Sequence, residues 1–85
     1  MQRPTLAPHA RYRWDRLREQ HQIVFPEGVL VLNPTGAAIV QLCDGRSRED
    51  LVAAIRDKFK DAAEDEVAAF LQRLAQKGLL RDADA

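Results

Sequence analysis

The sequence predicts an α+β domain in which a small antiparallel sheet comes first and three helices follow. Residues 1–33 hold three of the four prolines and most of the strand-forming residues, whereas residues 34–85 are rich in residues that favour helices. A length of 85 residues fits one domain. Hydrophobic residues make up 46% and charged residues 31% of the chain, which is the balance of a globular protein rather than a disordered one.

Three segments in the first part of the chain have strand patterns. Residues 10–15 alternate, so that Tyr12 and Trp14 face one way and the charged side chains face the other. Residues 22–25, which read Gln-Ile-Val-Phe, and the apolar residues 29–32 are the other two strands, and the Pro-Glu-Gly between them predicts a three-residue hairpin loop with a bulge. The polar stretch before residue 22 is predicted to be a connection. An antiparallel three-strand meander is the simplest arrangement of these segments.

Three helices follow, and the residues at their ends indicate where they start and stop. Asn33 can cap a first helix that begins with Pro and stops at residues 44–45, where Gly takes the left-handed position. Ser47 begins a second helix. A third helix runs over residues 64–77, and residues 79–81 add a short strand or pack back on the core. A three-stranded sheet followed by a three-helix bundle is the composition of a winged-helix-like domain.

The domain itself is predicted to span residues 10–81. Residues 1–9 contain two prolines and no periodicity, so they predict an extended N-terminal arm. Residues 82–85 are short and acidic, and they predict a frayed tail.

Charge and composition exclude several classes of partner. Thirteen basic residues balance thirteen acidic ones, which argues against a dedicated nucleic-acid or anionic-membrane binder. No apolar run approaches the ~20 residues of a membrane helix, and the N-terminus lacks the apolar segment of a signal peptide. A single cysteine fits a reducing compartment. We therefore expect a cytoplasmic protein without membrane or nucleic-acid partners.

The residues that usually carry chemistry do not form a recognisable catalytic or metal-binding motif. His9, His21 and Cys43 lack the paired spacing of a structural zinc site, and both histidines are predicted to be solvated. Cys43 lies on the apolar side of a helix end, which favours a buried thiol over a nucleophile. No phosphate-binding or hydrolase motif occurs. We expect no catalytic residues, no metal and no cofactor.

Winged helices often bind DNA, and the third helix tests that alternative. Its N-terminal end would enter the major groove, but here it reads Glu64-Asp65-Glu66. Three carboxylates would face phosphates where Arg and Lys are needed. The sequence therefore disfavours DNA recognition, which a gel shift at low salt would test.

The third predicted strand is the most informative feature. Val29-Leu30-Val31-Leu32 is apolar at every position, although a sheet with one covered face should alternate with polar residues. One interpretation is a central strand that is buried on both sides within the monomer. The other is an edge strand that accepts a peptide or a second copy of the chain.

The third helix adds a second observation. Glu64, Ala68, Leu71 and Ala75 form a ridge beside its core stripe of Val67, Phe70, Leu71 and Leu74. Small residues on this ridge would let an extended segment lie close to the helix. Alternatively, alanine is present only because it is a good helix former.

Several short runs follow one another in a recognisable order. They are Phe25-Pro26-Glu27-Gly28, Val31-Leu32-Asn33, Ile39-Val40-Gln41-Leu42-Cys43-Asp44-Gly45, and Phe70-Leu71 with Leu74, ending at Lys77-Gly78-Leu79-Leu80. Their order and spacing resemble the pyrroloquinoline quinone biosynthesis protein D (PqqD) family across roughly residues 4–81, and the "PEG…LN…LCDG" succession carries most of the resemblance.

The resemblance implies a non-catalytic peptide chaperone. Members of this family bind a ribosomally made precursor peptide and present it to a radical S-adenosylmethionine enzyme, which joins a Glu and a Tyr of that peptide. In similar recognition domains the peptide adds as a strand beside the third strand, in a groove closed by the third helix. Carried over to this chain, the peptide-binding residues are Val29, Leu30, Val31, Leu32, Val67, Ala68, Leu71, Leu74 and Ala75, with Ala68 near the entrance.

Two alternatives to the quinone pathway stay open at this point. Related domains occur in other peptide-modification pathways, so this chain could serve one of those instead. A strand-paired homo-oligomeric scaffold is the second alternative, motivated by the arm of residues 1–9 and the apolar strand. The two functions are compatible, because without peptide the same strand could pair with another copy in a homodimer.

Overall fold

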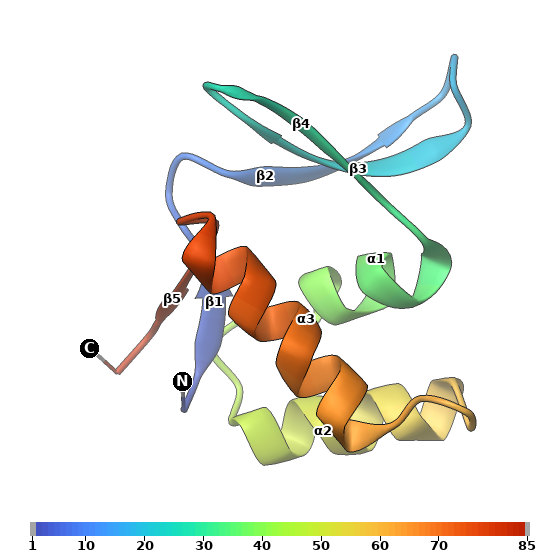
Figure 1. Ribbon diagram of the computed structural model, residues 1–85, viewed down its shortest axis with the longest axis vertical. Coiled ribbons are helices and arrows are strands. Elements are labelled where there is room, and N and C mark those ends of the chain that lie inside the picture. Colours follow the sequence, from blue (N-terminus) through green and yellow to red (C-terminus); the bar gives the residue numbers. More distant parts are fainter. Residues whose placement is uncertain (1, 85) are drawn as a thin grey trace.

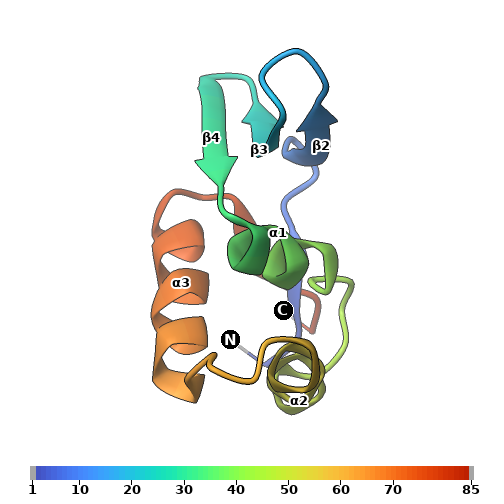
Figure 2. The ribbon, with the colours of Figure 1, turned by 90° about the vertical axis from the view of Figure 1, so that its right-hand side faces the viewer.

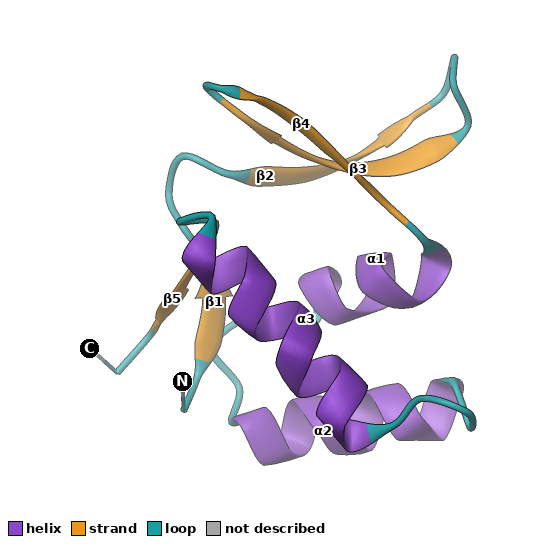
Figure 3. Cartoon of the chain, in the orientation of Figure 1, coloured by secondary structure: helices purple, strands orange, loops and turns teal. Residues whose placement is uncertain are grey.

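The computed structural model describes residues 2–84 and shows the predicted α+β, winged-helix-like architecture (Figures 1 and 3). A three-stranded antiparallel sheet is followed by three helices, and a short two-stranded sheet is added. The elements are β1 (Pro4–Leu6), β2 (Arg11–Asp15), β3 (Gln20–Phe25), β4 (Gly28–Leu32), α1 (Pro34–Gln41), α2 (Arg48–Lys58), α3 (Glu64–Gln76) and β5 (Leu80–Asp82).

The larger sheet lies above the helices, and its strand order decides which backbone edges are open. The order is β2-β3-β4, so β3 is central and β4 is an edge strand. Figure 2 shows β4 and α3 on the same side of the molecule, with α1 beside them and α2 below. The smaller sheet pairs β1 with β5.

The core lies between the inner face of the sheet and the three helices. Ile23 of β3 and both Leu51 and Ile55 of α2 are completely buried. Leu74 of α3 and Leu79 just after it are almost as inaccessible. These residues belong to one continuous apolar cluster, so the sheet and the helices fold as one unit.

The first hairpin differs from the prediction, because β3 begins at Gln20 rather than at residue 22. The buried carboxylate of Asp15 accepts hydrogen bonds from the backbone N–H groups of Leu17 and Arg18, which tightens the turn and lets pairing resume early. His21 therefore lies in a strand and is not a solvated loop residue. Its Nδ1 is 2.7 Å from Tyr12 Oη, and the Trp14 ring meets its ring edge-on at 4.8 Å between centroids.

The second hairpin is tighter than predicted. Phe25 pairs with Gly28, so the loop contains two residues rather than three. Gly28 has a φ of +157°, which an L side chain rarely adopts, and it is the first residue of β4 rather than a bulge. The register of the pair is Ile23 opposite Leu30.

The two N-terminal helix caps predicted from the sequence are confirmed, but the first helix ends earlier than predicted. Asn33 Oδ1 accepts the Gly36 N–H at 2.7 Å, and Ser47 Oγ accepts the Asp50 N–H at 3.1 Å. Helix α1 ends at Gln41 because the chain after it pairs with β1: Asp44 bridges Thr5, and residue 45 also bonds to this strand. Residues 44–45 therefore form a strand contact instead of a helix cap, although Gly45 does adopt a positive φ, of +94°.

Helix α3 ends as the sequence predicts. Gly78 has a φ of +75°, its N–H bonds to the Ala75 carbonyl, and the Leu79 N–H bonds to the Leu74 carbonyl. This pair of bonds is the Schellman arrangement, which glycine favours because it has no Cβ. The turn directs Leu79 into the core and leads into β5, so the optional last strand is present.

The predicted domain boundaries stay a prediction, but both end segments are paired with the rest of the chain. In β1, Thr5 lies opposite Arg81 of β5. The Asp82 carboxylate accepts the backbone N–H groups of Gln2 and Arg3, and Arg3 also pairs with Asp84 at 3.3 Å. The arm is thus a strand for part of its length, and residues 82–84 of the predicted tail are hydrogen-bonded. Residues 1 and 85 lie outside the described part.

The carboxylate of Asp44 makes the stability of the fold depend on pH in the acidic range. Its carboxylate accepts two hydrogen bonds from the Arg46 guanidinium, which lower its pKa from 3.8 to about 2. A carboxyl group whose pKa is lower in the folded chain than in the unfolded chain stabilises the fold at pH values above its unfolded-state pKa. This stabilisation is lost as the pH falls and the group is protonated. We expect the free energy of unfolding, measured with urea, to fall between about pH 4 and pH 2.

Asp15 and Asp82 also have lowered pKa values, caused first by backbone hydrogen bonds, and add to this acid dependence. An Asp44→Asn variant isolates the contribution of Asp44. It should be less stable than the wild type at pH 6 and lose less stability on acidification. An unchanged loss between pH 4 and pH 2 would contradict the assignment.

Candidate peptide-binding groove

Strand β4 presents an open backbone edge. Its other side is bonded to β3, and Phe25 and Gly28 close the hairpin as a two-residue turn. Starting from that turn, residue pairs with and without mutual hydrogen bonds alternate along the two strands. The backbone N–H and C=O groups of Leu30 and Leu32 therefore bond to β3. The N–H and C=O groups of Val29 and Val31 then point to the free edge. These are the groups that an added strand would bond.

The side chains of β4 divide between the two faces of the sheet, which explains why the strand is apolar throughout. Leu32 is buried, and Leu30 is half-buried against the core. The side chains of Val29 and Val31 alternate to the opposite face of the sheet and are 52% and 56% exposed, and Val31, at the open edge, also lines the groove beside α3. The interpretation as a strand buried on both sides within the monomer is therefore wrong, since one face is open.

A groove of about 240 Å³ lies between β4 and the second half of α3. In Figure 1 both elements cross the molecule diagonally, from upper left to lower right, with opposite chain directions. One wall comes from β4 and Asn33, and the other from α3 and its cap. The lining residues are Leu30, Val31, Leu32, Asn33, Phe70, Arg73, Leu74 and Lys77.

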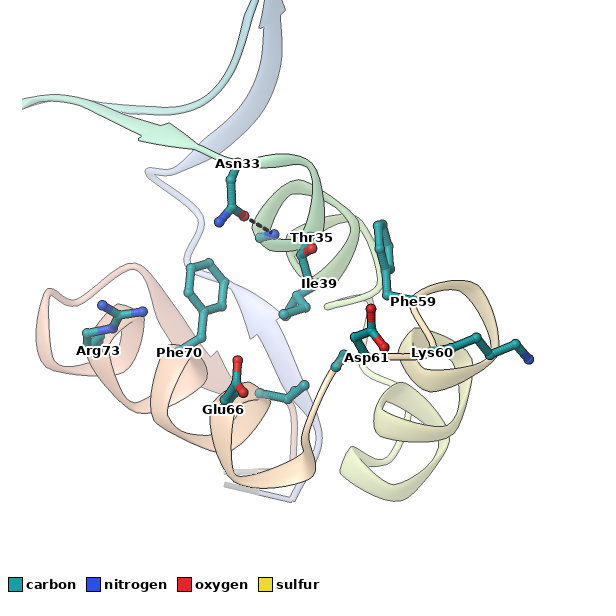
Figure 4. Close-up of a pocket in the computed structure, with 12 residues that line it drawn as sticks. Asn33, Thr35, Ile39, Phe59, Lys60, Asp61, Glu66, Phe70 and Arg73 are labelled. Carbon is teal, nitrogen blue, oxygen red and sulfur yellow. Dashed lines mark hydrogen bonds between the residues drawn. The ribbon is translucent and has the colours of Figure 1, made fainter.

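The groove continues into a larger hollow of about 440 Å³ beside α1, and Phe70 lies at the junction (Figure 4). Asn33, Phe70 and Arg73 line both spaces. The Phe70 ring packs against Gly36 at the start of α1, where an added Cβ would lie 3.2 Å from the ring. Glycine at this position therefore admits the ring.

The structure brings part of the predicted site together. Leu30, Val31, Leu32 and Leu74 line the groove, and Val67 lines the adjoining hollow. Val29 lies on the same strand and points its side chain to the outer face of the sheet.

The remaining predicted residues are placed elsewhere. Ala68, Leu71 and Ala75 do not line the groove between β4 and α3. They lie along a separate hollow of about 350 Å³ that is completed by Arg48 and Gln72. The ridge of small residues thus faces away from β4, and peptide contact at these three residues stays a prediction.

Sequence reasoning missed four residues of the groove. The sequence pattern places Phe70 in the core stripe and Asn33 at a helix cap, and it does not select the cations Arg73 and Lys77. The signal that could have found the cations is spacing, because Phe70, Arg73, Leu74 and Lys77 recur at helical intervals of three and four. Exposed Arg and Lys on a helix are so common that this spacing alone does not select them.

Cys43 does not supply a reactive thiol. It is buried, its Sγ donates to the Ile39 carbonyl at 3.2 Å, and burial together with the nearby Asp44 raises its pKa to about 12. Over residues 2–84, no three His, Cys, Asp or Glu side chains gather as a metal site would require. In the same range, no helix is long and apolar enough to cross a bilayer.

An open strand edge beside an apolar groove defines a domain that can hold an extended polypeptide segment as an additional strand. The model of the family "Coenzyme PQQ synthesis protein D (PqqD)" matches residues 20–80. The chain belongs to the PqqD family.

Relatives from three bacteria are similar over most of their length. A protein of Rhodopseudomonas palustris (strain BisB5) named "PqqA binding protein" is 41% identical, covering 95% of this chain and 83% of its own. Proteins with the same name from Klebsiella pneumoniae (strain 342) and Methylococcus capsulatus are 39% and 32% identical, covering 79% and 91% of this chain and 76% and 85% of their own.

A solved structure shares the fold. It is the solution NMR structure of the PqqD truncation of Methylobacterium extorquens PqqCD, described as a functional and stand-alone recognition element for ribosomally synthesised and post-translationally modified peptides. The TM-score is 0.68 at 28% identity, covering 92% of this chain and 87% of that one. The resemblance read from the sequence is thereby confirmed.

Proposed function

We propose that this chain is a non-catalytic chaperone that binds PqqA, the ribosomally made precursor peptide of pyrroloquinoline quinone. The observation that carries the proposal is the open edge of β4 beside the groove with α3. A segment of the peptide pairs with the main chain of Val29 and Val31. Its side chains on the inner face enter the groove over Leu30 and Leu74.

The names of the relatives support the peptide as the ligand. Several relatives are named "PqqA binding protein", and the structural neighbour is titled a recognition element. The groove lining supports a binding role. It contains apolar side chains, one amide and two cations.

The binding energy comes from two sources. Main-chain hydrogen bonds along β4 supply affinity without reading sequence, and the groove selects apolar side chains. Binding orders a flexible peptide, so these gains must exceed the entropy that the peptide loses.

The next partner in the proposal is a radical S-adenosylmethionine enzyme of the same pathway, to which the bound peptide is presented. The peptide is made on ribosomes, so both partners and this chain would act in the cytoplasm. The proposal needs no cofactor in this chain, because the domain only holds the peptide for another protein.

An amide-resolved NMR titration with synthetic precursor peptide tests the proposal. We expect saturable shifts concentrated on β4 and the second half of α3, and none with a scrambled peptide of the same composition. Shifts spread evenly over the domain, or no shifts at high peptide concentration, would contradict it. The second result would direct the search to precursors of other modified peptides.

A second arrangement is favoured by the exposed side chains of Val29 and Val31 on β4. Without peptide, the free edges of two copies could pair and form a homodimer. Size-exclusion chromatography with light scattering tests it, and a dimer that dissociates on adding peptide would support both roles. A monomer at all concentrations would exclude the homodimer and leave the chaperone proposal intact.

A further inference from the structure

The charges along the groove are one-sided, although the chain as a whole is neutral. Among the residues that the structure describes, Arg73 and Lys77 are the only charged ones that line the groove between β4 and α3, and both are cations. In the described part of the chain, neither forms an ion pair within 4.0 Å. A strand that occupies this groove therefore meets two uncompensated positive charges beside apolar walls.

The two cations are spaced to meet an extended chain. Residues four apart on a helix lie one above the other on one face, about 5–6 Å between Cβ atoms. Side chains on the same face of a strand are two residues apart, about 6.6–6.8 Å along it. Helix α3 and β4 run along the groove in opposite directions, so Arg73 and Lys77 can face successive inward side chains of an added strand (Figure 1).

Arg73 is already held at the rim. Its guanidinium carbon lies 5.7 Å from the centre of the Phe70 ring, within the range of a cation–π contact. Phe70 in turn packs against Gly36. Because this contact already restricts the Arg73 side chain, the side chain loses less conformational entropy when its guanidinium binds a ligand. This favours Arg73 for recognition of a carboxylate.

The adjoining hollow does not continue this one-sided charge. Its lining carries both signs, with Glu66 and Asp61 beside Arg73 and with Lys60 at its far side (Figure 4). The excess of positive charge therefore lies in the groove between β4 and α3, where it stabilises an acidic side chain of a bound strand.

We infer that Arg73 and Lys77 are specificity-determining residues of the groove. They select a peptide strand that carries Asp or Glu side chains next to the apolar side chains that enter the groove. This inference rests on the proposed function and adds to it the charge of the segment that is bound.

Cations near a helix C-terminus also have an ordinary explanation, because they interact favourably with the helix dipole. Helix α2 provides the matched control for that explanation. Its last turn carries Arg56 and Lys58, and Lys58 also lies 5.7 Å from a phenylalanine ring, that of Phe59. Neither residue lines the groove.

The test measures the affinity of the full chain for synthetic PqqA precursor peptide by calorimetry at low and at 0.5 M salt. At low salt we expect R73Q and K77Q each to weaken binding about two- to fivefold, and the double variant about tenfold. The control variant R56Q/K58Q removes the same charge and should bind as the wild type. At 0.5 M salt the difference should largely disappear.

Two further variants separate charge from packing. R73K keeps the charge and should retain most of the affinity, which a purely structural role of the guanidinium would not predict. A peptide whose Asp and Glu residues are replaced by Lys should bind more tightly to the R73E/K77E variant than to the wild type. An R73Q/K77Q affinity equal to that of the wild type, or an equal loss in R56Q/K58Q, would overturn the inference while leaving peptide binding at β4 in place.

Failure of the proposed function gives a different result in the same experiment. If the wild type does not bind the peptide, or if the NMR shifts avoid β4 and α3, both proposals are overturned together.

Discussion

Replacing Val31 by proline should weaken peptide binding strongly while leaving the domain folded. The N–H of Val31 points to the open edge of β4, so proline removes a donor that the domain itself does not use. Its loss leaves a peptide carbonyl unpaired in the complex, and the ring obstructs close approach. We expect a cost of about 2–3 kcal/mol, or about 30- to 150-fold in Kd, measured by calorimetry with precursor peptide.

Val31→Thr is the matched control for this prediction. Threonine keeps the N–H and the branched shape, and the side chain it replaces is 56% exposed on the outer face. Peptide affinity should stay within a few-fold of the wild type. Circular dichroism should show that both variants are folded. Wild-type affinity in the proline variant, or an equal loss in the threonine variant, would argue against main-chain pairing at β4.

The largest effect on stability should come from Ile23→Ala. Ile23 is at the centre of β3 and is 0% exposed, so the substitution leaves a cavity between the sheet and the helices. Such replacements cost about 2–5 kcal/mol, a large share of the about 5–15 kcal/mol that stabilises a small domain. Urea unfolding followed by circular dichroism should show a transition midpoint at much lower urea, or a chain that is already partly unfolded in buffer.

Val29→Ala gives the comparison on the neighbouring strand. Val29 lies one residue from Leu30, the partner of Ile23, but its side chain is 52% exposed. Its removal should cost less than about 1 kcal/mol. If both variants lost similar stability, the assignment of inner and outer faces would be wrong.

Local signals in the sequence predicted β2 to β4, the three helices and most of their ends, but not β1, which lies in the expected N-terminal arm. Asn33, Ser47 and Gly78 act through bonds to residues three to five positions away, so their roles can be read from short segments. The end of α1 was misplaced because it depends on β1, which is about 40 residues earlier in the chain. A pattern confined to residues 34–45 contains no information about that contact.

The groove was only partly predictable for a related reason. Its existence follows from the apolar run of β4, but the part of α3 that faces it depends on the rotation of the helix about its axis. Leu71 and Leu74 are both buried and belong to the same apolar stripe, yet only Leu74 lines the groove. Periodicity identifies the stripe and leaves open which of its two borders lies beside β4.

The pairing of β1 with β5 brings the two described ends of the chain close together in space. The described ends lie side by side, joined by strand pairing and by the bonds of Asp82 to Gln2 and Arg3 (Figure 1). A short linker could therefore join the ends, and new ends could be opened at the exposed turn around Leu17 without breaking either sheet. By the same topology, a chain shortened to begin at Ala10 would lose β1, and β5 would then become unpaired.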